Sequence, residues 1–235
     1  AAVVAGLATF DPDVTVAGAI LNRVASPRHG AEVARGLAQL GIPVLGQIPR
    51  TESIFVPSRH LGLVPAGEWE DSATKVAGLG DLIAEYVDLD AVMDLAATAP
   101  GLDVEPWDPA AALESAGWQG HPFGESPLVG MFAGRAFTFR YPETTEMLVA
   151  AGFRVVDVDP LTDRRLPDGI QGLYLGGGFP QMHATDLETN SELADDVRSH
   201  AEAGMPIVAE CAGLLYLCRH LDGHEMAGVL PMDAA

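Results

Sequence analysis

The chain alternates short apolar runs with segments of helical periodicity, and this alternation constrains the fold more than any other feature. Each apolar run is bounded by turn residues, which is typical of buried strands. Strands that alternate with helices pair in parallel through right-handed crossovers. The sequence therefore predicts an α/β fold built on parallel sheets. The expected strands are residues 14–24, 42–49, 128–132, 153–158, 172–177 and 206–210, and the expected helices are residues 28–41, 71–99, 141–152, 191–204 and 212–221.

Residues 100–127 interrupt the alternation. They are rich in proline and glycine and show no sustained periodicity, which is typical of a linker. We therefore expect two domains, at residues 1–99 and 128–235. The start of the chain has no initiator Met and resembles the last turns of a helix, so we also expect a fragment of a longer protein.

The charge of the chain restricts its partners. Lysine and arginine number 13 against 33 acidic residues, which gives a net charge of −20. Such a surface repels nucleic acid and anionic lipid, so neither is an expected partner. No apolar run reaches the roughly 18 residues of a membrane helix, and the first residues carry no basic cluster, so we expect a soluble protein. With two cysteines seven residues apart, we expect reduced thiols and a cytoplasmic protein.

Cys211 lies in the stretch PIVAECAGLLYL, between an expected strand and an expected helix. Functional groups in open α/β sheets collect at the carboxyl ends of strands. The N–H groups of a helix N-terminus lower the pKa of a thiol there and stabilise an oxyanion. Ala212 and Gly213 supply the small residues that a sharp turn needs. A buried thiol used as a small apolar group is the alternative, and it is our interpretation of Cys218.

A glycine triplet, residues 176–178, closes the strand expected before this one. Glycines let the backbone approach a ligand and direct N–H groups at an oxyanion, as acyl transfer requires. A flexible turn is the alternative. We expect the triplet and Cys211 to lie side by side, with the thiol facing the amide groups. A thiol that pointed inward among packed side chains, far from the triplet, would contradict this interpretation.

The residues of both halves resemble a known family. GLYLGGGFPQMHATDLETN, PIVAECAGLLYL and AGRAFTFRYPETTEML (133–148) resemble the class I glutamine amidotransferase domain of the cobyrinic acid a,c-diamide synthases. AGAILNRVASPRHGAEVARGLAQLGIPVLGQIPR and PSRHLGLVPAGE resemble the end of that family's ATP-dependent domain, which is similar to dethiobiotin synthetase. The resemblance implies part of a P-loop synthetase-like domain followed by part of a flavodoxin-like amidotransferase domain.

The resemblance also implies a reaction. Glutamine would be hydrolysed at one site, and its ammonia would amidate the a- and c-acetate carboxylates of a corrinoid that ATP and Mg²⁺ have activated. Cys211 would be the nucleophile, and a homodimer is left open. The remaining implied roles are oxyanion donors at Gly177, Gly178 and Ala212, nucleotide contacts at Asn22, Arg23 and Pro49, and substrate or nucleotide contacts at Arg59 and His60. Without the resemblance, Asn22 would be a turn residue, and Arg59 and His60 an exposed loop pair.

The chain departs from the family's pattern in three ways. No G-x-x-x-x-G-K-[ST] phosphate loop occurs, and the single lysine, Lys75, has no glycine loop before it. The family's histidine base lies beyond Ala235, and His183 is the least implausible substitute. Ala212 replaces a glycine. No residue is assigned to a metal, and we expect residues 1–235 alone to be inactive.

Two other functions compete with this one. The first is an amidotransferase that acts on another tetrapyrrole, either nickel-sirohydrochlorin or a cobyric acid precursor. The second is a non-catalytic binding protein that keeps the amidotransferase fold with a dead site.

Overall fold

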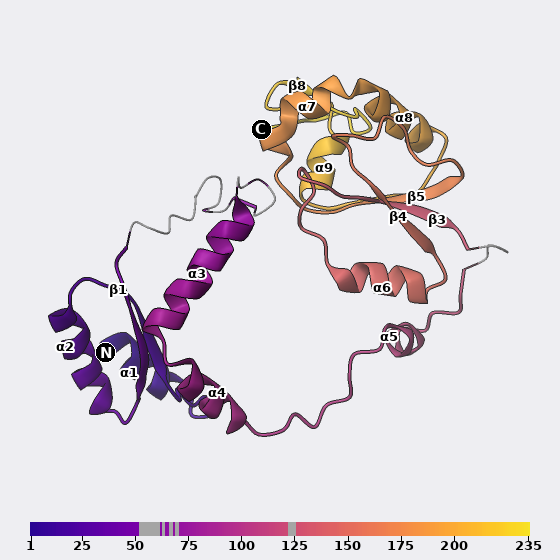
Figure 1. Ribbon diagram of the computed structural model, residues 1–235. Helices are drawn as coiled ribbons and strands as arrows, with labels where there is room; N and C mark the ends of the chain where they lie inside the picture. The colour runs from indigo at the N-terminus through magenta and orange to yellow at the C-terminus, as the bar shows by residue number, and fades with distance from the viewer. Residues whose placement is uncertain (52–61, 63, 66–67, 69–70, 122–125) are drawn as a thin grey trace. The chain divides into compact units, whose positions relative to one another are not determined.

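The computed structural model describes residues 1–235 except 52–61, 63, 66–67, 69–70 and 122–125 (Figure 1). The chain divides into two compact units, Ala1–Val104 and Glu105–Ala235. The division falls inside the segment that the sequence predicts as a linker. That segment is not wholly irregular, because helix α5 (Pro109–Ser115) forms within it and packs against a helix of the second unit.

The first unit is a strand–helix–strand arrangement, as its sequence predicts. Strands β1 (Ala19–Val24) and β2 (Val44–Pro49) pair in parallel, and helix α2 (Pro27–Ala38) connects them. Ser26 caps α2 by accepting a hydrogen bond from the His29 N–H at 3.2 Å, and Pro27 occupies the first turn, where its missing N–H costs nothing. The unit also holds α1 (Ala2–Phe10), α3 (Ser72–Tyr86) and α4 (Leu89–Ala97).

Two expectations for this unit are wrong. The single helix expected over residues 71–99 is two helices, because Val87 turns extended and forms a bridge with Gly46. Asp88 then starts α4, where its side chain caps the helix by accepting a hydrogen bond from the Ala91 N–H. The apolar periodicity continues through this break, so the sequence pattern does not reveal it. The strand expected from residue 14 begins at Ala19 and is only partly buried, with Ile20 48% exposed.

The second unit is built on a parallel four-stranded sheet with the order β4-β3-β5-β6. Its strands are β3 (Leu128–Phe132), β4 (Arg154–Val158), β5 (Ile170–Leu175) and β6 (Ile207–Ala209). Helix α6 (Pro142–Ala150) lies on one face, and α7 (Ala184–Thr189), α8 (Ser191–Glu202) and α9 (Ala212–Leu217) lie on the other (Figure 1). This is the parallel α/β architecture that the alternation predicts.

Some local structure of this unit differs from expectation. The 3₁₀ helix η3 (Pro180–His183) and α7 follow the glycine triplet, where no helix was expected. Helix α9 ends at Leu217 rather than at residue 221. The chain then forms a small sheet in the order β8-β7-β9, with strands β7 (His220–Leu221), β8 (His224–Glu225) and β9 (Asp233–Ala234). No helix in the described part of the chain combines the length and the apolar character of a membrane span.

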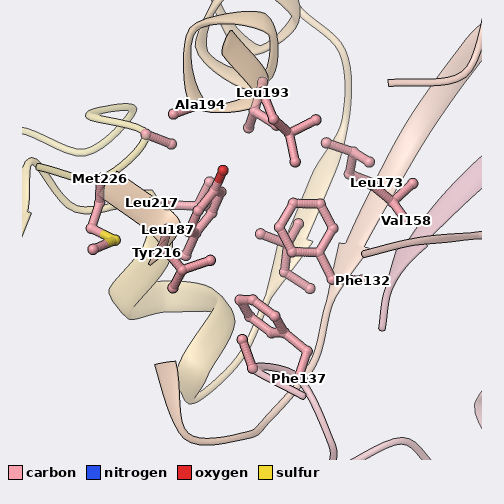
Figure 2. Packing of buried hydrophobic residues seen from close by; sticks show 14 of the residues in the cluster. Phe132, Phe137, Val158, Leu173, Leu187, Leu193, Ala194, Tyr216, Leu217 and Met226 are labelled. Carbon is pink, nitrogen blue, oxygen red and sulfur yellow. The ribbon is translucent and has the colours of Figure 1, made fainter. Parts of the chain in front are cut away.

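The core of the second unit lies between the sheet and the helices α7, α8 and α9 (Figure 2). Phe132 contacts Phe137 and Tyr216 edge to face, with ring centroids 5.0 and 5.2 Å apart. Such aromatic pairs add to the free energy that burial alone supplies. Burial also raises the pKa of Tyr216. Because Tyr216 belongs to α9, this packing fixes the helix that begins directly after Cys211.

Candidate active site

Cys211 occupies a sharp turn between β6 and α9. Its φ is +50° and its ψ −113°, which is a rare conformation for a residue with a side chain. Such strain costs about 1–3 kcal/mol and persists only where the surrounding structure imposes it. The side chain is exposed, at the N-cap position of α9. This is the backbone geometry of a nucleophile elbow, in which a strained strand-to-helix turn projects the reactive group.

Hydrogen bonds to β5 hold the turn in place. The Glu210 N–H donates to the Leu175 carbonyl at 3.0 Å, and the Gly213 N–H donates to the carbonyls of Gly176 at 3.0 Å and Glu210 at 2.8 Å. Gly213 lies so close to β5 that an added Cβ would be 2.3 Å from the Leu175 carbonyl oxygen. The turn therefore requires a glycine at 213, and it brings Cys211 beside the glycine triplet.

The glycine triplet packs against the chain itself. An added Cβ at Gly178 would lie 2.2 Å from the Ala136 carbonyl oxygen, and one at Gly177 would lie 3.1 Å from the Cβ of Phe139. The sequence predicts that these glycines permit the close approach of a ligand. In the structure they permit the approach of the loop that follows β3.

The peptide groups of the triplet differ in direction. The Gly176 carbonyl points at the Gly213 N–H. Because the peptide that joins Gly176 to Gly177 is trans, the Gly177 N–H points the opposite way. Gly177 also faces Phe139 in an antiparallel bridge, where its carbonyl accepts the Phe139 N–H at 3.1 Å. Of the three expected oxyanion donors, Gly177 has the weakest geometric support. Ala212 is buried at the first position of α9, directly after Cys211.

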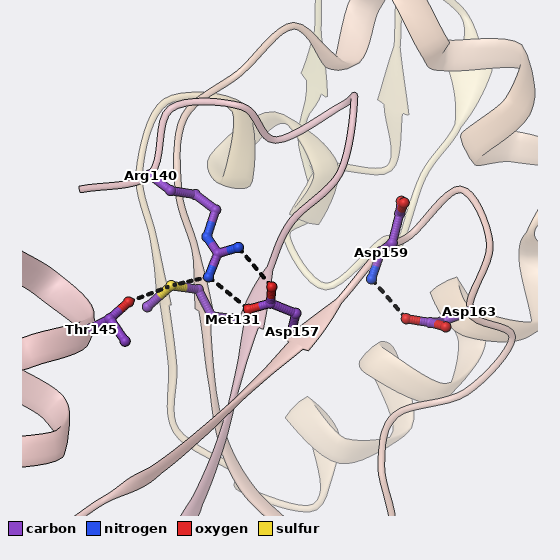
Figure 3. Close-up of polar contacts among 6 residues, drawn as sticks. All are labelled: Met131, Arg140, Thr145, Asp157, Asp159 and Asp163. Atoms are coloured by element: carbon purple, nitrogen blue, oxygen red, sulfur yellow. Dashed lines mark hydrogen bonds and ion pairs between the residues drawn. The ribbon is translucent and has the colours of Figure 1, made fainter. Parts of the chain in front are cut away.

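The loop after β3 is itself anchored (Figure 3). The Arg140 guanidinium donates two hydrogen bonds to the Asp157 carboxylate, at 2.6 and 2.9 Å, and a third at 3.4 Å to the Met131 sulfur. A bidentate pair of this kind fixes orientation as well as distance. Because the loop packs on the glycine triplet, this pair helps to place the backbone beside Cys211.

Sequence reasoning missed the role of Glu210. The Tyr174 hydroxyl donates a hydrogen bond of 2.7 Å to the Glu210 carboxylate, which ties the residue before Cys211 to β5. Burial and this hydrogen bond raise the pKa of Tyr174. The available signal was the position of an acidic residue next to the thiol, at the end of an otherwise apolar strand.

Cys218 has the character expected of a packing residue. It is 2% exposed, and its thiol donates to the Leu214 carbonyl at 3.3 Å. Burial, with a smaller effect of Asp233, raises the pKa of this thiol. The two cysteines therefore differ strongly in their surroundings.

The histidines near Cys211 in sequence have acidic neighbours. His220 lies 2.8 Å from Asp233, and His224 lies 2.8 Å from Glu188. These contacts lower the pKa of both carboxylates. His183, the least implausible substitute for the family's base, is buried in η3.

The expected nucleotide contacts of the first unit lie together. Asn22 and Arg23 form a bulge in β1, at the end where Val24 pairs with Pro49 of β2. The φ of Arg23 is +56°, and its N–H donates to the Asn22 side-chain oxygen at 2.8 Å. This local bond fits the turn interpretation of Asn22 and leaves its NH₂ group available. Arg59 and His60 lie outside the described residues.

Two family models match the chain. A CobB/CobQ-like glutamine amidotransferase domain matches residues 129–235, and a CobQ/CobB/MinD/ParA nucleotide binding domain matches residues 1–64. Hydrogenobyrinate a,c-diamide synthase of Thermobifida fusca is 49% identical over 98% of the chain. The family is thereby decided. The chain belongs to the cobyrinic acid a,c-diamide synthase family.

Further relatives agree with this family. Hydrogenobyrinate a,c-diamide synthase of Streptomyces coelicolor is 44% identical over the full chain, and cobyrinate a,c-diamide synthase of Listeria monocytogenes is 37% identical over 97% of it. The matches cover 49% of the Thermobifida and Listeria proteins and 53% of the Streptomyces protein. The chain thus spans about half the length of these a,c-diamide synthases, and the nucleotide binding domain confirms the expected synthetase-like half.

Proposed function

We propose that the protein containing this chain uses glutamine and ATP to amidate the a and c carboxylates of hydrogenobyrinic or cobyrinic acid. The observation that carries the proposal is Cys211, an exposed thiol in a strained turn beside the carboxyl end of β5. A thiol so placed can attack a carbonyl carbon. The names of the relatives supply the corrinoid acceptor.

In the glutaminase step, the Cys211 thiolate adds to the side-chain carbonyl of glutamine. The carbonyl oxygen becomes an oxyanion, and the N–H groups of Ala212 and Gly178 are the donors that we propose for it. When the tetrahedral adduct collapses, the C–N bond breaks and the amine leaves as ammonia after taking up a proton. Water then hydrolyses the thioester, which releases glutamate and restores the thiol.

The scaffold around Cys211 suits this step. The turn is held by three backbone hydrogen bonds, and Tyr216 anchors α9 in the core. A nucleophile fixed in this way does not lose orientational entropy when it reacts. The Glu210 carboxylate, held by Tyr174, lies on the adjoining residue of the turn.

The nucleotide side rests on Asn22, Arg23 and Pro49, which lie together at the carboxyl end of the β1–β2 pair. The Asn22 NH₂ group is a donor that the acceptor nitrogens of an adenine could use, and the Arg23 guanidinium is exposed beside it. ATP supplies the phosphoryl group that activates the carboxylate. In the described part of the chain no cluster of three histidine, cysteine or acidic residues could hold a metal ion, so we assign no residue here to Mg²⁺.

For the acceptor we favour cobalt-free hydrogenobyrinate. Among the most similar relatives, those named for it are 43–49% identical to this chain, and those named for cobyrinate are 37–38% identical. The a,c-diamide products of the two differ only in the metal.

The test uses the whole protein, with glutamine, ATP and either corrinoid. Mass spectrometry should detect the diamide, with hydrogenobyrinate converted faster. Cys211→Ser should abolish amidation from glutamine and retain amidation from added ammonium salt, whereas Cys218→Ser should retain both. Glutamine-dependent amidation by the Cys211→Ser protein, or no amidation of either corrinoid by the unmodified protein, would overturn the proposal.

A further inference from the structure

The second unit has a small pocket whose lining has no role in the steps proposed above. Its volume is about 260 Å³, and its polar lining consists of Arg135, Thr162, Arg164, Asp186, Thr189 and Asn190. The pocket lies where the loops after β3 and β4 meet α7. In the strand order β4-β3-β5-β6, β4 is three strand spacings, about 14 Å, from the strand that carries Cys211. Ligands of open α/β sheets bind at this carboxyl edge.

Asn190 builds the floor of the pocket. It is 3% exposed, and its NH₂ group donates to the carbonyls of Pro160 and Asp163, both at 2.7 Å. Its oxygen accepts a hydrogen bond of 3.4 Å from the Arg164 guanidinium. One buried amide therefore fixes the loop after β4 and directs Arg164, which keeps most of its five N–H donors for other partners.

The loop that carries Arg135 is fixed against the same structure. Gly134 has a φ of +81°, and an added Cβ there would lie 2.3 Å from the Asp159 carboxylate. Asp159 in turn begins the loop after β4, where its N–H donates to the Asp163 carboxylate at 2.8 Å (Figure 3). The two arginines are thus presented by two loops that touch.

The charges of the lining define a ligand. Arg135 forms no hydrogen bond or ion pair with any residue that the structure describes, in a chain whose acidic residues greatly outnumber its basic ones. Arg135 and Arg164 suit two carboxylates. Asp186 suits an ammonium group, and Thr189 adds acceptor lone pairs because its hydroxyl proton is donated to the Thr185 carbonyl.

We propose that this pocket binds an acidic α-amino acid such as L-glutamate or L-aspartate. The two arginines and Asp186 give the lining a net charge of +1, which complements the net charge of −1 of such a molecule. The volume is just below the roughly 300 Å³ at which pockets for drug-sized ligands begin, so a small metabolite fits. Leu161 offers an apolar surface for the methylene groups.

The experiment is an NMR titration of the 235-residue chain whose Cys211 has been alkylated with iodoacetamide, which removes binding at the elbow. L-Glutamate and L-aspartate should give saturable shifts of the Arg135 and Arg164 Nε–H signals. Because the lining is exposed, we expect millimolar affinity that weakens with salt. Arg135→Gln and Arg164→Gln should each weaken binding by about fivefold or more, since charge-assisted hydrogen bonds are lost. Arg165 is the next residue and does not line the pocket, so Arg165→Gln should leave binding unchanged.

The comparison ligands test the ammonium contact. Glutarate lacks the amine, and inorganic phosphate lacks both the amine and the carbon chain, so both should bind more weakly than L-glutamate. Asp186→Asn should remove the advantage of L-glutamate over glutarate. Shifts that do not saturate, binding that Arg164→Gln leaves unchanged, or phosphate that binds as well as L-glutamate would overturn the proposal. None of these results bears on the role of Cys211.

Discussion

Replacing Gly213 by alanine tests how the turn at Cys211 is held. The new methyl group would lie 2.3 Å from the oxygen and 2.5 Å from the Cβ of Leu175, and these atoms belong to a central strand that cannot rotate away. Overpacking a core costs about 1–3 kcal/mol, and the backbone clash places this case at the upper end. The greater helical preference of alanine offsets about 1 kcal/mol. We therefore expect a net loss of about 2 kcal/mol in the free energy of unfolding of the second unit.

The assay is pulse alkylation of Cys218 at increasing urea concentration, because this buried thiol becomes reactive only when the second unit unfolds. Gly172→Ala is the matched control. Gly172 lies in β5, the strand that Gly213 packs against, but its added Cβ would meet atoms no closer than 3.6 Å, an ordinary contact. We expect its stability to change by less than about 1 kcal/mol. Equal stability of the two variants would refute the argument that β5 imposes the turn.

Two further predictions concern stability. Asn190→Ala should lower the free energy of unfolding by about 1–3 kcal/mol, because two carbonyls lose their buried donors. Asn22 is exposed, so Asn22→Ala should have little effect. Similar urea midpoints for the two variants would contradict this prediction. The hydrogen bonds from His224 and the Glu225 N–H lower the pKa of Glu188, so its contribution is present above the ordinary pKa of glutamate and is lost as pH falls through the lowered value. The urea midpoint should therefore fall more steeply between about pH 5 and pH 3 in the unmodified chain than in Glu188→Gln, and parallel curves would contradict this.

The central strands of the second unit, β3 and β5, follow from the sequence because they are largely buried, whereas the edge strands β4 and β6 are more exposed. β3 and residues 172–175 of β5 are continuous runs without a charged residue or an amide side chain, which is typical of buried strands in a parallel sheet. In the first unit, β1 also reads as apolar but is half exposed, since among the described residues it has one neighbouring strand. Apolar pattern alone does not report how many neighbours a strand has.

The turn at Cys211 was predictable and its partners were not. A thiol followed by two small residues at the end of a strand indicates the elbow from local chemistry. The tie of Tyr174 to Glu210 and the packing of residues 136–139 on the glycine triplet join segments more than 30 residues apart in sequence. Such contacts depend on the strand order, which local patterns do not specify.

Asn190, which lines the small pocket, also makes contacts that local sequence patterns do not predict. Asn190 directly precedes a helix, and its sequence position indicates a cap. In the structure its side chain caps no N–H of α8 and binds the loop after β4 instead. The buried Asn190 amide therefore makes a tertiary contact, although its position before a helix predicts a cap.

The central claim, that Cys211 is an exposed and activated thiol at the end of β6, is tested most directly by the rates at which iodoacetamide alkylates the two cysteines at neutral pH. Peptide mass spectrometry resolves them within one sample. We predict that Cys211 reacts more than about tenfold faster than Cys218, whose pKa is raised by burial and which alkylates only when the unit opens. In the whole protein, glutamine should slow the reaction of Cys211 alone. Equal rates for the two thiols, with no effect of glutamine, would contradict the account.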